Sequence, residues 1–259
     1  MIKVGIVGMG VIGTHVARAI DSGIPGIALA GVSVRATARP GPYPVWNPDE
    51  LIRRSDLVVE AATQAALLEI GPAVLKAGKH LMVLSVGALI GVLDEWARLA
   101  EKHGCRILVP SGAIAGLDGM KGAREGAITS VTMETRKPPR GLAGAPYVIE
   151  RQIDLDAIET ETLIFEGPAT LAVKAFPANV NVVAALSLAG LGPDRTRIKI
   201  FAVPGQAVNH HRVLVEGEFG RLRVEVENIP SENPRTGRLS YFSAIAMLRE
   251  MGASVQVGN

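Results

Sequence analysis

Three glycines near the start of the chain have the spacing of a phosphate-binding turn. Gly8, Gly10 and Gly13 lie in the stretch VGMGVIGT and match the pattern G-x-G-x-x-G. In this pattern the first glycine makes the turn, the second lets a pyrophosphate approach the backbone, and the third lets a helix pack closely on a strand. The first helical residues, Val11 and Ile12, would then present backbone N–H groups and a partial positive charge to the phosphates.

The surroundings of these glycines favour a dinucleotide-binding unit over a turn that binds nothing. Residues 3–7 form a short β-rich run, and the helical pattern that follows the glycines ends at Gly23. A second apolar run at residues 27–34 completes a βαβ unit of the length that the glycine pattern requires. The sequence therefore predicts that NAD or NADP binds here.

The residues after the second strand bear on the choice of coenzyme. An NAD enzyme places Asp or Glu about twenty residues past the glycines, where it binds the ribose 2′-hydroxyl. The corresponding stretch is GVSVRAT, which contains no carboxylate. Ser33, Arg35 and Thr37 could hold a 2′-phosphate instead, although Arg35 could equally be a solvated loop residue. NADP is thus at least as plausible as NAD.

The rest of the first half alternates helices and strands. We expect helices at residues 48–54, 64–77 and 89–103, with Asn47 as the cap of the first, and strands at residues 57–61, 80–84 and 106–109. Repeated strand and helix with short connections predict an α/β fold with a doubly wound parallel sheet. We assign residues 1–109 to this Rossmann domain.

The pattern changes after Pro110. Apolar and polar side chains alternate at residues 128–136, 197–203, 208–216 and 222–227, and helical patterns cover residues 169–175 and 179–189. A closing helical pattern at residues 239–251 is of a kind that often packs back on the first domain. Strands with this alternation are covered on one face only. The pattern predicts a second α+β domain, with a mainly antiparallel sheet, over residues 110–231.

Composition and charge exclude several classes of protein. The 27 basic and 25 acidic residues are mixed along the chain without a basic run, so a nucleic-acid partner is not expected. We find no charged leader with a long apolar run, so we expect neither a signal peptide nor a membrane span, and we expect a cytoplasmic protein. The single Cys105 excludes an internal disulfide and is expected in the core, and no metal ligands are assigned.

Several further stretches carry a resemblance to a known family. They are residues 84–88, 110–118, 176–189, 209–213 and 230–237. Together they resemble the L-aspartate dehydrogenase family over essentially the whole chain. The resemblance implies NAD(P)-dependent oxidation of L-aspartate to iminoaspartate and then to oxaloacetate and ammonia, or the reverse, feeding pyridine-nucleotide synthesis. It also implies a homodimer, a Rossmann domain completed by residues 232–259, and a second domain that serves catalysis and dimerisation.

The resemblance implies that a histidine in an Asn-x-His-x-aliphatic strand is catalytic. The matching stretch is Asn209-His-His-Arg-Val213, which places this residue at His211. Because strand residues alternate in direction, His211 should share a face with Val213, and His210 should face the other way with Arg212. A base of pKa about 6.5 could activate the water that attacks the imine.

Further site residues follow from the same resemblance. The contacts near the nicotinamide fall on Ala113 or its neighbour Ala115, and on Asn179 or Asn181. We favour Asn181, because Asn179 is better suited to capping the helix. The substrate carboxylates need cationic or hydroxyl partners, for which Lys137, Lys174 and Ser111 are candidates, with Arg136 behind them.

Two alternatives to an aspartate dehydrogenase stay open at this point. One is a reductase or dehydrogenase of similar two-domain plan that acts on dihydrodipicolinate or homoserine. The other is a nucleotide-binding protein that has lost its chemistry.

Overall fold

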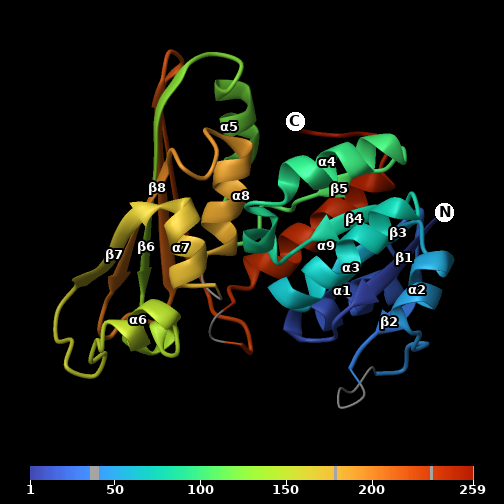
Figure 1. The fold of residues 1–259 in the computed structure, drawn as a ribbon, viewed down its shortest axis with the longest axis horizontal. Helices are drawn as coiled ribbons and strands as arrows, with labels where there is room; N and C mark the ends of the chain where they lie inside the picture. Colours follow the sequence, from blue (N-terminus) through green and yellow to red (C-terminus); the bar gives the residue numbers. More distant parts are fainter. Residues whose placement is uncertain (36–40, 178–179, 234–235, 259) are drawn as a thin grey trace. The chain divides into compact units, whose positions relative to one another are not determined.

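The chain forms two compact units, coloured along the sequence in Figure 1. The computed structural model describes residues 1–35, 41–177, 180–233 and 236–258. The first unit contains Met1–Pro110 and Ser240–Val257, and the second contains Ser111–Leu239. The second boundary therefore follows Leu239, whereas the sequence analysis places it at residue 232.

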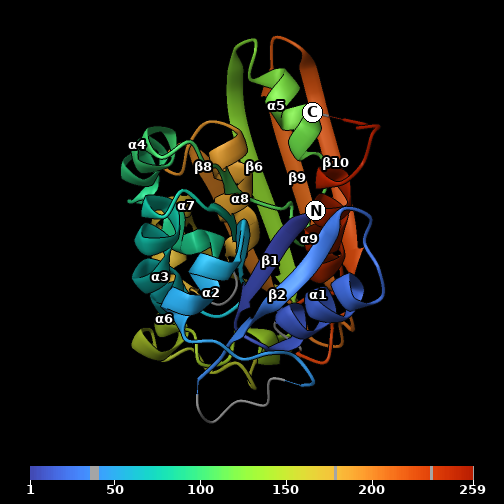
Figure 2. The ribbon, with the colours of Figure 1, turned by 90° about the vertical axis from the view of Figure 1, so that its right-hand side faces the viewer.

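The first unit is built on a five-stranded parallel sheet. Its strands, in spatial order, are β2 (Ile27–Ser33), β1 (Ile2–Val7), β3 (Leu57–Glu60), β4 (His80–Val83) and β5 (Ile107–Leu108). Figure 2 shows β1 and β2 side by side, and every pairing in this sheet is parallel. The predicted doubly wound parallel sheet is confirmed. Because β2 and β3 flank β1 on opposite sides, the strand order reverses at β1, which is where open α/β sheets bind their ligands.

Helices lie on both faces of this sheet. They are α1 (Val11–Asp21), α2 (Pro48–Arg54), α3 (Gln64–Lys76), α4 (Leu93–Lys102) and α9 (Leu239–Met251). Val4 and Ile6 of β1 share a buried cluster with residues of α1 and α9, while a Cβ at Gly5 would meet Leu51 of α2. Asn47 caps α2 by accepting a hydrogen bond from the Glu50 N–H, as predicted.

The helix predicted at residues 89–103 begins later than expected. A short 3₁₀ turn, η1 (Val86–Leu89), comes first, and α4 starts only at Leu93. Gly91 lies between them with φ of +98°. A left-handed residue interrupts the helical path, so the apolar spacing that spans residue 91 belongs to two separate elements.

The second unit contains a mixed sheet that is mainly antiparallel, as predicted. Its strands, in spatial order, are β10 (Gly220–Asn228), β9 (Asn209–Gly217), β6 (Ile128–Lys137), β8 (Thr196–Ala202) and β7 (Thr162–Pro168). Only the pairing of β6 with β8 is parallel. β7 is not predicted from the sequence, because three consecutive apolar residues and a register shift between Leu163 and Phe165 hide its alternation.

Short helices cover one face of the second sheet. They are α5 (Leu117–Ala123), η2 (Pro139–Leu142), α6 (Pro146–Glu150), α7 (Ala169–Ala175) and α8 (Asn181–Ala189). Met120 of α5, Ala172 of α7 and Val183 of α8 belong to one buried cluster with Met133 and Ile198 of the sheet. Figure 1 shows α7 and α8 together beside this sheet. We did not predict α5 or α6, which are too short to show a clear period.

The opposite face of the second sheet is polar. Along β8, Ile198 and Ile200 are buried while Arg197 is exposed, which confirms the predicted alternation. Among the described residues, none of the helices has the length and apolar character that crossing a membrane requires.

Gly13 is packed so closely that a methyl group in its place should destabilise the first unit. A Cβ at Gly13 would lie 2.0 Å from the carbonyl oxygen of Gly8, which is backbone and cannot move aside by changing rotamer. We expect Gly13→Ala to lower the free energy of unfolding by about 2 kcal/mol or more, because this overlap outweighs the helix propensity gained, about 1 kcal/mol. Urea unfolding followed by circular dichroism measures the change.

Gly10→Ala is the matched control. A Cβ at Gly10 would meet no atom of the described residues within 4 Å, and its φ of −73° suits any residue. This variant should stay within about 1 kcal/mol of the original chain. Equal losses in both variants would contradict the packing argument.

Candidate active site

The glycine turn, residues 8–13, is wedged between the ends of β2 and β3 in the first unit. The Gly8 N–H donates to the carbonyl oxygen of Ser33 at 2.9 Å. Gly8 has φ of +92°, and a Cβ there would lie 2.7 Å from the Ala61 carbonyl oxygen. Position 8 therefore requires glycine for both its conformation and its close packing.

Gly10, in the middle of the turn, has open space beside it, whereas Gly8 and Gly13 are closely packed. Gly10 is exposed and forms the N-cap of α1, where no side chain among the described residues makes a capping hydrogen bond. Val11 and Ile12 are the first helical residues, so their N–H groups have no partner within the helix. An open approach to positively polarised N–H groups fits a pyrophosphate, and the turn therefore fits the predicted dinucleotide.

A buried carboxylate next to this turn is a residue that the sequence analysis missed. Glu60 ends β3 and is fully buried, and its carboxylate accepts hydrogen bonds from the N–H groups of Ala62 at 2.8 Å and of Ser85 at 3.0 Å. The Ser85 hydroxyl donates a third at 2.9 Å. Burial raises the pKa of Glu60, while these donors oppose the rise. The side chain holds together the loops after β3 and β4, at the ligand-binding edge of the sheet.

Ser33 and Arg35 lie at the end of β2, as the coenzyme prediction requires. Ser33 is the last residue of the strand and is buried, and Arg35 follows it with an exposed side chain. At this position the Arg35 side chain fits both roles, that of binding a 2′-phosphate and that of a solvated loop arginine. Thr37, the third residue of that prediction, lies outside the described residues.

In the second unit, five buried polar side chains gather at one end of the sheet. This polar end consists of Thr135 and Lys137 on β6, Asn209 and His211 on β9, and Asn228 on β10, each at most 4% exposed. Strand register explains the grouping, because Thr135 pairs with His211 and Asn209 pairs with Asn228. Further along the same faces the buried residues are apolar, such as Met133 and Val213.

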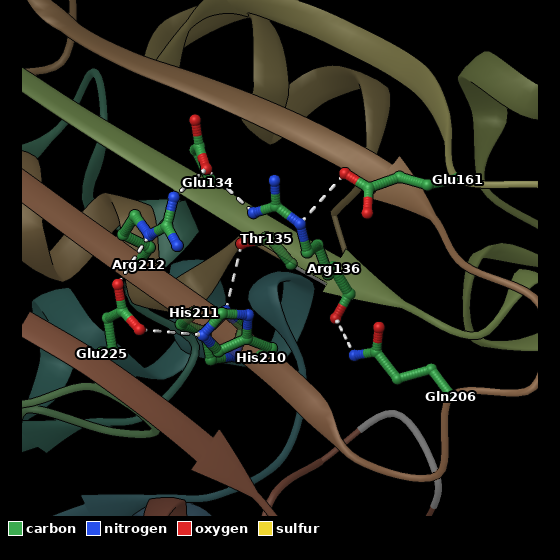
Figure 3. A network of polar contacts seen from close by, with 9 residues as sticks. All are labelled: Glu134, Thr135, Arg136, Glu161, Gln206, His210, His211, Arg212 and Glu225. Carbon is green, nitrogen blue, oxygen red and sulfur yellow. Dashed lines mark hydrogen bonds and ion pairs between the residues drawn. The ribbon is translucent and has the colours of Figure 1, made fainter.

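The two neighbouring histidines of β9 face opposite ways, as predicted. His211 is buried on the face it shares with Val213, and His210 lies on the other face with its Nε2 3.8 Å from a carboxylate oxygen of Glu225. Figure 3 shows the Thr135 hydroxyl bonded to the His211 ring, with 3.1 Å between Oγ1 and Nδ1. This contact occupies Nδ1 and leaves Nε2 as the nitrogen for proton transfer.

The pKa of His211 differs from the value of about 6.5 used in the sequence analysis. Burial lowers the pKa of this imidazole to about 3, with smaller contributions from the nearby Lys137 and His210. The ring is therefore neutral at neutral pH and can accept a proton. The sequence alone could not show this shift, because it arises mainly from burial in the folded chain and also from Lys137 on another strand.

Lys137 brings a cation to the same buried face. Burial lowers its pKa to about 8, so the ammonium group is still mostly protonated at pH 7. A Cβ at Gly141 would lie 3.7 Å from Cβ and 3.9 Å from Cδ of Lys137. The turn η2 thus covers the stem of this lysine.

The loop expected to contact the nicotinamide is attached to the polar end. Asn228 donates from its side-chain nitrogen to the carbonyl oxygen of Ala113 at 2.6 Å. Ala113 is buried, whereas Ala115 is exposed. Of the two alternatives left by the sequence, the structure connects Ala113 with the buried polar residues.

Asn181 is the first residue of α8 and is half-buried, and the N-cap of that helix is Val180. Capping therefore does not account for Asn181. Asn179, the alternative, lies outside the described residues.

Comparison with known families gives one match for each half of the chain. Residues 8–110 match the family described as "Homoserine dehydrogenase, NAD binding domain". Residues 118–251 match the family described as "Aspartate dehydrogenase, C-terminal".

Relatives aligned over nearly their whole length support the match to the aspartate dehydrogenase family. The chain is 46% identical to the L-aspartate dehydrogenase of Methanosarcina acetivorans, with both chains covered completely. It is 44% identical to L-aspartate dehydrogenase 3 of Bordetella bronchiseptica, over 98% of this chain and 97% of that protein.

Solved structures show the same fold. The aspartate dehydrogenase of Thermotoga maritima has a TM-score of 0.79 at 24% identity, with both chains fully covered. A hyperthermophilic archaeal homoserine dehydrogenase in complex with NADPH has a TM-score of 0.58 at 12% identity, with 95% of each chain covered. From these similarities, the chain belongs to the L-aspartate dehydrogenase family and is an oxidoreductase that uses NAD or NADP.

Proposed function

We propose that this enzyme oxidises L-aspartate to iminoaspartate, which is hydrolysed to oxaloacetate and ammonia, or catalyses the reverse reaction. The observation that carries the proposal is the buried His211, held by Thr135 in the half of the chain that matches the aspartate dehydrogenase family. In this scheme residues 1–109 with residues 232–259 bind the coenzyme, and residues 110–231 supply the catalytic groups.

The pyrophosphate of the coenzyme would be held by backbone groups of the first unit. The open approach at Gly10 and the N–H groups of Val11 and Ile12 suit its pyrophosphate, with Gly8 and Gly13 shaping the turn. Ala113 and Asn181 offer backbone and amide groups that suit the carboxamide of the nicotinamide, and Ala115 is the less favoured alternative. When bound, a nicotinamide coenzyme accepts a hydride from the α-carbon of an amino acid.

His211 would manage the proton that hydrolysis requires. Water attacks the carbon of the imine, and Nε2 of His211 takes a proton from that water as general base. A ring with a pKa of about 3 is a weak base. A substrate carboxylate close by would raise this pKa, because opposite charge stabilises the imidazolium. The base therefore gains strength when the substrate is present.

A homoserine-type substrate is the second candidate, since residues 8–110 match the homoserine dehydrogenase NAD-binding family. That match concerns the coenzyme-binding half. A panel of L-aspartate, L-homoserine and dihydrodipicolinate decides between the candidates, and coenzyme binding without turnover of any substrate would favour a non-catalytic protein.

The remaining expectations concern partners and location. The family resemblance implies a homodimer and a supply of product to pyridine-nucleotide synthesis. Light scattering measures the molar mass in solution and so tests the homodimer. Cys105 is buried as a free thiol, as predicted. A free thiol and no disulfide suit the cytoplasm, which stays our predicted compartment.

We expect L-aspartate to support reduction of NAD or NADP, followed at 340 nm, and His211→Ala to lower kcat by about 100-fold or more. The reason is that the alanine cannot accept a proton from water, while removal of a buried neutral ring leaves coenzyme binding in place. Absence of turnover with L-aspartate in the original chain would reject the proposed reaction.

His210→Ala is the matched control for this variant. It removes the same side chain from the adjacent position, on the opposite face of β9. We expect kcat to stay within about threefold of the original. Equal losses in both variants, or full activity in His211→Ala, would reject the role of His211.

Arg35→Ala tests the choice of coenzyme. If the exposed guanidinium binds a 2′-phosphate, its loss should raise KM for NADP by about tenfold or more and leave KM for NAD unchanged, because NAD lacks that phosphate. Steady-state kinetics with each coenzyme at saturating L-aspartate give the two values. A strong preference for NAD that Arg35→Ala does not alter would remove this assignment.

A further inference from the structure

The buried face of the second sheet places a cation beside the candidate base. Lys137 and Thr135 are alternate residues of β6, so they point to the same face, and the Thr135 hydroxyl contacts His211. Lys137 is 4% exposed, and its charge is close enough to lower the pKa of His211. Among the described residues, Lys137 is the one lysine or arginine with a buried side chain.

Burial of an ammonium group is costly, which makes its position informative. Natural chains bury a charge where it meets an anion or serves the chemistry. Next to a histidine proposed to act on an amino dicarboxylate, the fitting anion is a carboxylate of the substrate.

The other cationic candidates from the sequence do not share this position. Arg136 lies on the opposite face, where it bonds Glu134 at 2.8 Å and Glu161 at 3.1 Å, as Figure 3 shows. Lys174, in the last turn of α7, is exposed. Ser111 is half-buried and carries no charge. Of the four candidates, Lys137 is therefore the one cation on the buried face that holds His211.

We infer that the ammonium group of Lys137 binds a carboxylate of the dicarboxylic substrate beside His211. This inference rests on the proposed function, because it takes L-aspartate as the molecule that reaches His211. Lys137 then favours acidic over neutral amino acids.

The test uses binding as well as turnover. Succinate is a dicarboxylate that lacks the amino group, and succinamide is its neutral counterpart. Calorimetry at pH 7, with and without NADP, should show that the original chain binds succinate in preference to succinamide. Lys137→Met should weaken succinate binding by at least about tenfold and raise KM for L-aspartate by a similar factor, with a smaller change in kcat.

Stability separates this role from a structural one. Replacing a buried charge by an apolar side chain of similar length is often neutral or stabilising, so the melting temperature of Lys137→Met should not fall. If this variant does not fold, Lys137→Gln, which keeps a polar group, takes its place in the same assays.

Two matched variants serve as controls. Lys199→Met makes the same change on the polar face of β8 and should leave succinate binding unchanged. Lys174→Met removes the exposed lysine that the sequence also suggested, and we expect succinate binding to stay unchanged. Loss of succinate binding in Lys174→Met but not in Lys137→Met would overturn the inference.

The remaining outcomes distinguish this inference from the proposed reaction. A folded Lys137 variant that binds succinate as tightly as the original chain would overturn the inference even if L-aspartate is oxidised. Absence of succinate binding by the original chain would also overturn the inference. Succinate binding that depends on Lys137, without turnover of L-aspartate, would keep the carboxylate site and reject the reaction.

Discussion

The candidate active site depends on the burial of a row of polar side chains at one end of a sheet face that is otherwise apolar. Pairing of β6 with β9 brings Thr135 opposite His211, and the covering helices exclude water from both side chains. Burial of polar groups is tolerable only when each has a hydrogen-bond partner. Among the described residues, every fully buried side-chain nitrogen or oxygen has one. Burial also lowers the pKa of His211, so the ring is uncharged at neutral pH, the state in which an imidazole can act as a proton acceptor.

The first unit uses burial in a related way. Glu60 is withdrawn from water at the end of β3, yet three donors from two loops bond its carboxylate. A carboxyl group in this position fixes the backbone more firmly than an apolar residue, because its loss would leave buried N–H groups unpaired. Gly8 packs against Ala61, one residue beyond Glu60, so the carboxylate also supports the wall of the glycine turn. In each unit, buried polar groups thus position the loops and side chains that we expect to contact ligands.

Much of the fold follows from patterns local in the sequence. The βαβ unit, the cap at Asn47, the start and end of α9, and the opposite orientation of the two histidines depend on neighbouring residues, and all four are confirmed. The missed features depend on residues far apart in the chain. β7 carries a register shift, α4 is displaced by the left-handed Gly91, and Glu60 reads as one polar residue in an apolar strand until Ser85 is brought to it. The pKa of His211 belongs to the same group, because it depends on burial in the folded chain and on Lys137, which is distant in the sequence.

The protonation state of His211 in the folded protein tests this account most directly. The chain has five histidines, so ¹⁵N-histidine labelling gives a spectrum simple enough to follow each ring from pH 8 to pH 5, with His211 assigned by its loss in His211→Asn. The account predicts a ring that stays neutral over this whole range, since its pKa is lowered to about 3. A His211 ring that titrates near the ordinary value of about 6.5 would contradict this expectation, because burial would then not govern the pKa of the ring.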